Sequence, residues 1–135
     1  MVVSINPKKV KVLLVDDHEL TLLSLQLALS NYSEMEVTGL ASNGLEAVEK
    51  ARSLHPDVVL LDLQMPVMDG FSASTQIKQL CPDTKILAYS SLKDQRAAIA
   101  HQMQSFDGFC GKDVSTFDLF CLIKQLGNQA EVHSN

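Results

Sequence analysis

Short apolar runs alternate with amphipathic stretches five times along this chain of 135 residues, and few folds accommodate such a pattern. The runs 10–15 and 58–61 are apolar at almost every position, as expected of strands that are covered on both faces. Strands that alternate with helices form a parallel sheet, and right-handed crossovers place the helices on both sides of it. The sequence therefore predicts an α/β fold, a doubly wound five-stranded parallel sheet with helices on both faces.

The apolar pattern also gives the expected order of the elements. The predicted strands are 10–15, 35–41, 58–61, 86–89 and 107–110. The predicted helices are the stretch around 20–27, the one that starts at 43, 70–80, a weaker one over 94–103, and the one that starts at 115. Asn43 with Glu46, and Ser115 with Asp118, resemble capping boxes at two of these helix starts. The last helix is predicted to end at Gly127, which leaves a folded domain 9–126, an N-terminal extension 1–8 and a polar C-terminal tail 127–135.

Composition favours one compact domain with a protein partner. Hydrophobic residues make up 46% of the chain, which is enough for a single core. The net charge of -5 and the lack of a concentrated basic face argue against direct nucleic acid binding. No apolar stretch approaches the roughly 18 residues of a membrane span, so we expect no membrane contact. Cys81, Cys110 and Cys121 lack metal-ligand spacing, and such reduced thiols indicate a cytoplasmic protein.

Three carboxylates stand at the ends of two predicted strands. Asp16 and Asp17 follow the run 10–15, and Asp62 follows the run 58–61. Ligands of an open parallel sheet bind beyond the carboxyl ends of its strands, so these acids are expected to meet there. Three carboxylates in one crevice repel one another unless a cation joins them. Mg²⁺, which takes one or two carboxylates with phosphate oxygens and waters, fits this cluster better than Ca²⁺, for which no loop offers enough ligands.

Asp62 is the predicted nucleophile of this site. It precedes a loop, 63–70, that contains proline and glycine, and the core lies behind it. One carboxylate oxygen can therefore bind metal while the other attacks phosphorus. Ser90 follows the fourth predicted strand and Lys112 the fifth, which brings a hydroxyl donor and an ammonium group to the same crevice. The four histidines are scattered without a pair at ligand spacing, so they are expected at the surface with no metal role: His18, His55, His101 and His133.

These residues resemble the response-regulator receiver domain of two-component signalling, a flavodoxin-like fold. The resemblance covers roughly residues 9–126 and depends on five features: Asp16-Asp17, Asp62, the loop Met65-Pro66-Val67-Met68-Asp69-Gly70, Ser90 and Lys112. The segments Asp16-Asp17-His18 and Lys112-Asp113 resemble the NarL/FixJ subfamily in particular. Members of that subfamily usually carry a DNA-binding helix-turn-helix after the receiver, and the 135 residues contain no such segment.

The resemblance implies that Asp62 accepts a phosphoryl group from a sensor histidine kinase or a histidine phosphotransfer protein. It implies that Asp17, Asp62 and the backbone carbonyl of Gln64 bind Mg²⁺, with Asp16 acting largely through water. Lys112 would pair with the phosphoryl oxygens. The chain would then be a phosphoacceptor signalling domain and not an enzyme, although it can assist its own phosphorylation and dephosphorylation.

The resemblance also implies a switch. Ser90 would hydrogen-bond the new phosphoryl group and draw its loop inward, while Phe109 would fill the space behind it. These changes would alter the face formed by helix 94–103, strand 107–110 and the last helix. That face is expected to engage a downstream protein, an output domain or a second copy of the chain in a homodimer. Many family members have Tyr at the position of Phe109, and a Phe ring, which lacks a hydroxyl, favours staying buried in both states.

Three other functions fit parts of the pattern. A haloacid-dehalogenase-type phosphatase also uses an aspartate and Mg²⁺, but it needs a second acid two residues later, where this chain has Gln64. A flavodoxin-like cofactor binder needs a phosphate loop rich in Ser, Thr and Gly after the first strand, where this chain has acids. A receiver used only as a protein-interaction module stays open, because only a phosphorylation assay separates it from a phosphoacceptor.

Overall fold

The computed structural model describes residues 8–91, 100 and 103–132, and its centre is one parallel sheet. The sheet has five strands in the order β2-β1-β3-β4-β5, and every neighbouring pair is parallel. Its strands are β1 (Val10–Val15), β2 (Met35–Ala41), β3 (Val58–Asp62), β4 (Lys85–Ser90) and β5 (Gly108–Gly111). The predicted doubly wound α/β fold is confirmed. The strand order reverses between β1 and β3, and ligands of such sheets bind at that point, beyond the carboxyl ends.

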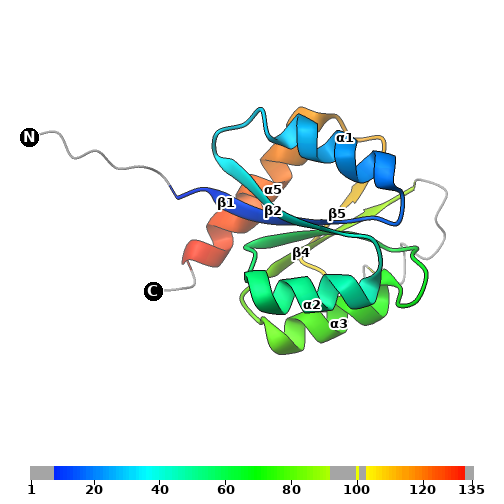
Figure 1. The fold of residues 1–135 in the computed structure, drawn as a ribbon. Coiled ribbons are helices and arrows are strands. Elements are labelled where there is room, and N and C mark those ends of the chain that lie inside the picture. Colours follow the sequence, from blue (N-terminus) through cyan, green and yellow to red (C-terminus); the bar gives the residue numbers. More distant parts are fainter. Residues whose placement is uncertain (1–7, 92–99, 101–102, 133–135) are drawn as a thin grey trace, which may run out of the picture.

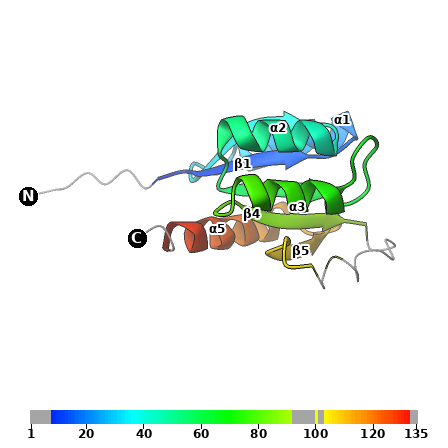
Figure 2. The ribbon, with the colours of Figure 1, turned by 90° about the horizontal axis from the view of Figure 1, so that it is seen from below.

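Helices cover both faces of the sheet, as Figures 1 and 2 show. They are α1 (Glu19–Leu29), α2 (Gly44–Leu54), α3 (Gly70–Leu80) and α5 (Thr116–Val132). In Figure 1, α1 and α5 lie on one face, and α2 and α3 lie on the other. The predicted helix 94–103 falls almost entirely outside the described residues. None of the described helices is both long enough and apolar enough to cross a lipid bilayer.

The central strand β3 divides the interior into two cores. All five of its residues are buried. Val59 and Leu61 point toward α2 and α3, whereas Val58 and Leu60 point toward α1 and α5, because successive side chains of a strand face opposite ways. This two-sided burial explains why the run is apolar at every position except its last, Asp62. The strand therefore delivers one carboxylate from a rigid, fully packed element.

Side-chain caps form at both predicted helix starts, and at the first of them Glu46 hydrogen-bonds the hydroxyl of Ser42. The Asn43 side chain accepts a hydrogen bond from the backbone N–H of Glu46 at 2.9 Å, which caps α2. The Glu46 carboxylate accepts from the hydroxyl of Ser42 at 3.1 Å. At the start of α5, the Ser115 hydroxyl accepts from the backbone N–H of Asp118 at 3.1 Å. Both predicted helix starts are therefore confirmed.

The predicted end of the last helix at Gly127 is wrong, because α5 continues to Val132. A Cβ atom at position 127 would lie 2.7 Å and 2.9 Å from the two methyl groups of Val10. Glycine at this position lets α5 approach the start of β1 closely and does not terminate the helix. The domain limits at residues 9 and 126 stay a prediction. The three cysteines are free as expected, with Cys81 buried but Cys121 exposed.

Candidate functional site

The sheet brings the three predicted acids together. Asp16 and Asp17 follow β1, and Asp62 is the last residue of β3, whose Leu61 pairs with Val15 of β1. Asp16 is fully buried and Asp62 is 3% exposed, whereas 30% of the Asp17 side chain is exposed. One oxygen of each carboxylate and a ring nitrogen of the neighbouring histidine all lie within 4.8 Å of one another. The predicted crevice is therefore a compact cluster of ligand atoms.

Lys112 reaches this cluster from the end of β5. Its Nζ lies 3.1 Å from Oδ2 of Asp16 and 3.3 Å from Oδ2 of Asp62. Burial lowers the pKa of Lys112, but the hydrogen bond to Asp16 and the charges of Asp62 and Asp16 outweigh burial and raise it overall. The amine stays protonated at neutral pH. The peptide bond that follows Lys112 is trans, like the other described peptide bonds.

The surroundings of Asp62 change the pKa of its carboxyl group. Its pKa is raised to about 6. Burial is the main cause and the charge of Asp16 adds to it, while the backbone N–H of Gln64 and the ammonium of Lys112 act in the opposite direction. The Gln64 N–H donates to Oδ1 of Asp62 at 3.2 Å, so the second oxygen of this carboxylate faces Lys112. A buried carboxylate with this pKa gains strongly from a cation.

The donor set fits a hard divalent ion. Among the described residues, the three carboxylates of the cluster have one ammonium group beside them, that of Lys112 near Asp16 and Asp62, which leaves an excess of two negative charges in a largely buried crevice. Mg²⁺ binds oxygen ligands of this kind and keeps several waters, which the exposed side of Asp17 allows. Asp16, Asp17 and Asp62 are thus the residues that could hold the metal, with the Gln64 carbonyl as a further predicted ligand.

The loop between β3 and α3 is fixed by close backbone approaches. A Cβ atom on Gly70 would lie 2.4 Å from the carbonyl oxygen of Asp62, and one on Gly44 would lie 2.1 Å from that of Met68. The N–H of Gly44 donates to the same Met68 oxygen at 3.0 Å, which ties the loop to the start of α2. Val67, at the tip, is 81% exposed and has a φ of 69°, a left-handed conformation that a β-branched residue rarely adopts. The loop beside Asp62 is therefore anchored at both ends and strained at its tip.

Ser90 and Phe109 occupy the neighbouring strands. Ser90 ends β4, pairs with Gly111, and its carbonyl accepts from the Lys112 N–H at 2.8 Å. This places Ser90 at the same edge of the sheet as the acids. Phe109 lies in β5 and packs toward the core beneath α3, with its ring centroid 5.9 Å from that of Phe106. The structure brings Asp16, Asp17, Asp62 and Lys112 into direct proximity, with Ser90 and Phe109 at the adjoining strands.

Two residues at the site escaped the sequence prediction. Tyr89 is 6% exposed, and Nζ of Lys112 lies 5.6 Å from the centre of its ring, so this ring helps to position the amine. His18 is at the surface as predicted, with 69% of its side chain exposed, but its Nδ1 lies 3.1 Å from an oxygen of both Asp16 and Asp17. The only sequence signal for His18 is its position directly after the acid pair.

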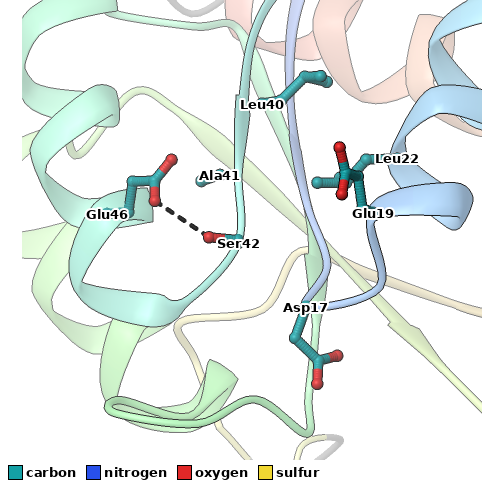
Figure 3. Close-up of a pocket in the computed structure, with 7 residues that line it drawn as sticks. All are labelled: Asp17, Glu19, Leu22, Leu40, Ala41, Ser42 and Glu46. Atoms are coloured by element: carbon teal, nitrogen blue, oxygen red, sulfur yellow. Dashed lines mark hydrogen bonds between the residues drawn. The ribbon is translucent and has the colours of Figure 1, made fainter.

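A hollow lies beside the acids, between α1 and α2 (Figure 3). Its lining includes the acids Asp17, Glu19 and Glu46 and the apolar residues Leu22 and Ala41. Of the acid cluster, this hollow includes only Asp17. The chemistry of the cluster therefore lies next to this hollow and not inside it.

Comparison with known proteins identifies the family. The model of the response regulator receiver domain matches residues 12–124. The chain belongs to this family. The receiver domain is 38% identical over 110 residues to the response regulator protein VraR of Staphylococcus aureus, an alignment that covers 82% of this chain. It spans 53% of VraR, about half the length of that relative.

Two solved receiver structures also resemble this chain in sequence and in fold. The response regulator domain of CheB from Thermotoga maritima is 31% identical, with a TM-score of 0.81 over 90% of this chain and 98% of that one. The signal receiver domain of the putative response regulator NarL from Mycobacterium tuberculosis is also 31% identical, with a TM-score of 0.80 and the same coverage. The latter similarity agrees with the predicted resemblance to the NarL/FixJ subfamily. This chain is thus a receiver domain of two-component signalling.

Proposed function

We propose that this receiver domain is a phosphorylation-activated switch in which Asp62 accepts a phosphoryl group from a sensor histidine kinase or a histidine phosphotransfer protein. One observation carries the proposal: a carboxylate that is 3% exposed ends the central strand, with the ammonium of Lys112 at 3.3 Å and a second buried acid, Asp16, 3.1 Å from that ammonium. A carboxylate so placed can bond an incoming phosphorus centre while Lys112 and a bound cation offset the negative charge.

In the transfer, an oxygen of Asp62 bonds to phosphorus as the P–N bond of the donor phosphohistidine breaks, and the electron pair of that bond stays on the donor imidazole. The ammonium of Lys112 stabilises the negative charge that develops during the transfer and pairs with an oxygen of the phosphoryl group. Asp17, Asp62 and the carbonyl of Gln64 would hold Mg²⁺, with Asp16 contributing through water. When bound, Mg²⁺ neutralises negative charge and orients phosphoryl oxygens.

The output of the switch is proposed to run through Ser90 and Phe109. Ser90 ends the strand next to Asp62, so its hydroxyl would bond the new phosphoryl group, and Phe109 would follow. These movements of Ser90 and Phe109 would change the face formed by helix 94–103, β5 and α5. Residues 94–103 lie mostly outside the described residues. A phosphoryl group that moves such an equilibrium from 1:99 to 99:1 must favour one state by about 5.5 kcal/mol.

The partners of that face are a downstream protein, an output domain or a second copy of this chain. VraR, twice as long as the matched region, shows that relatives carry more chain than a receiver. Because the donors of receiver domains are kinases and phosphotransfer proteins, we also propose that the domain acts in the cytoplasm.

A labelling experiment tests the proposal. The chain is incubated with acetyl phosphate and Mg²⁺, and its intact mass is followed over time. We expect a gain of one phosphoryl group that disappears in Asp62→Asn and on chelation of the metal. Asp83→Asn makes the same chemical change at an exposed turn before β4, far from the acids in the sheet, and should label like the wild type. Labelling of Asp62→Asn at the wild-type rate would refute the proposed acceptor, and no labelling of any variant would favour a pure interaction module.

A further inference from the structure

His18 lies against the metal-binding acids in a way that its role as a surface residue does not require. Its Nδ1 is 3.1 Å from Oδ1 of Asp16 and 3.1 Å from Oδ1 of Asp17. The same Asp16 oxygen accepts a hydrogen bond from the His18 backbone N–H at 2.8 Å, which fixes the turn that brings the ring over the acids. His18 starts α1 without capping it through its side chain. The ring is therefore held at the acid cluster and is not committed to the helix.

The separations match those between neighbouring ligands of one metal ion. Octahedral bonds of 2.0–2.1 Å place adjacent ligand atoms about 3.0 Å apart. The imidazole nitrogen stands at 3.1 Å from one oxygen of each adjacent acid. Together with Asp62, these ligand atoms fit within 4.8 Å of one another. The nitrogen is thus spaced from the carboxylate oxygens as a neighbouring ligand of the same ion would be.

A nitrogen ligand changes which ions the site prefers. Mg²⁺ takes oxygen ligands and gains little from imidazole, whereas Ni²⁺, Cu²⁺ and Zn²⁺ bind imidazole well. We propose that His18 is a metal-selectivity residue, whose Nδ1, held beside Asp16, joins Asp17 and Asp62 as a direct ligand and lets the crevice take late first-row divalent ions as well as Mg²⁺. This inference rests on the metal site of the proposed function and adds a ligand to it.

The exposure of His18 supports this role. With 69% of its side chain exposed, the ring can turn to present its lone pair to an ion without breaking a packed core. A purely structural imidazole would only donate a hydrogen bond to the two carboxylates. That arrangement would influence all divalent ions alike, because it acts through the orientation of the acids and not through a metal–nitrogen bond. Selectivity between ions therefore separates the two roles.

The test compares His18→Asn with His55→Asn on the whole chain. His55 is exposed at the end of α2 with a φ of 48°, a conformation that Asn tolerates, so the second variant makes the same chemical change away from the acids. Calorimetric titration with Mg²⁺ and with Ni²⁺ gives two affinities for each protein. We expect His18→Asn to lose about tenfold or more in Ni²⁺ affinity and less than about twofold in Mg²⁺ affinity, with His55→Asn like the wild type.

A spectroscopic readout shows the bond itself. With Cu²⁺ as a probe, electron paramagnetic resonance should show nitrogen coupling in the wild type and in His55→Asn, and none in His18→Asn. Equal losses of Ni²⁺ and Mg²⁺ affinity, or nitrogen coupling that survives in His18→Asn, would overturn the inference while leaving the proposed magnesium site intact. A wild-type chain that binds neither Mg²⁺ nor Ni²⁺ would overturn both.

Discussion

Asp62→Asn should stabilise the metal-free protein. The carboxylate of Asp62 is almost fully buried, and its pKa is raised from 3.8 to about 6, mainly by burial. A raised pKa in the folded state means that the ionised form opposes folding. The difference of about 2 units corresponds to about 3 kcal/mol at 1.36 kcal/mol per unit. Asparagine has nearly the same size, can still accept from the Gln64 N–H, and carries no charge.

The pH dependence follows from the same shift. Below pH 3.8 the carboxyl group is protonated in both the folded and the unfolded chain, so it has no effect on stability. The destabilising effect grows as the pH rises from 3.8 to about 6 and is constant above that. Asp62→Asn should therefore exceed the wild type in free energy of unfolding by about 3 kcal/mol at pH 7.5 and by only about 1 kcal/mol at pH 4.5.

Urea unfolding followed by circular dichroism, with a chelator present, measures these differences. Asp83→Asn serves as the exposed control and should match the wild type at both values of pH. Addition of Mg²⁺ should narrow the difference, because the ion binds more tightly to the chain that keeps the Asp62 carboxylate. A variant Asp62→Asn that is no more stable than the wild type at pH 7.5, or a difference that does not shrink at pH 4.5, would refute the electrostatic account.

Three further predictions test the parts around the acceptor. Lys112→Ala removes the only ammonium group near the acids among the described residues, so the rate of labelling by acetyl phosphate should fall by about 100-fold, and a rate within twofold of the wild type would contradict this role. Gly44→Ala should lower the free energy of unfolding by about 1 to 3 kcal/mol, because its Cβ would meet a backbone oxygen at 2.1 Å. Gly39→Ala, whose Cβ would meet side chains and no backbone, the nearest being the end of Leu54 at 2.8 Å, is the control and should cost less in urea unfolding. Val67→Gly should raise the melting temperature by relieving about 1 kcal/mol of strain at its φ of 69°, and an unchanged or lower value would show that the tip is relaxed.

The sequence predicted the fold because its strands are marked by burial on both faces. The run 58–61 is apolar throughout and ends in a charged residue, a pattern that few other elements produce, and β3 has those residues with Asp62 as its last. The acids and Lys112 could be placed for the same reason, since parallel strands deliver their carboxyl ends to one edge. Which of the acids Lys112 contacts could not be predicted. That Lys112 contacts Asp16 as closely as Asp62 depends on the path of the chain after β5.

The errors arose where a residue's role depends on distant contacts. Gly127 looks like a helix terminator in the sequence, but its lack of a side chain serves the contact with Val10, more than one hundred positions away. His18 looked isolated because no second histidine stands at ligand spacing from it. Its partners are the two preceding acids, and only the turn after β1 folds its ring back onto them.

The most direct test of the account is the identity of the phosphorylated residue. After incubation with acetyl phosphate and Mg²⁺, borohydride reduces an aspartyl phosphate to homoserine, which peptide mass spectrometry locates in the chain. We expect homoserine at position 62, in an amount that depends on Mg²⁺ and is strongly reduced in Lys112→Ala. Homoserine at Asp16 or Asp17, or at an exposed acid outside the crevice, would contradict the claim that Asp62 is the acceptor.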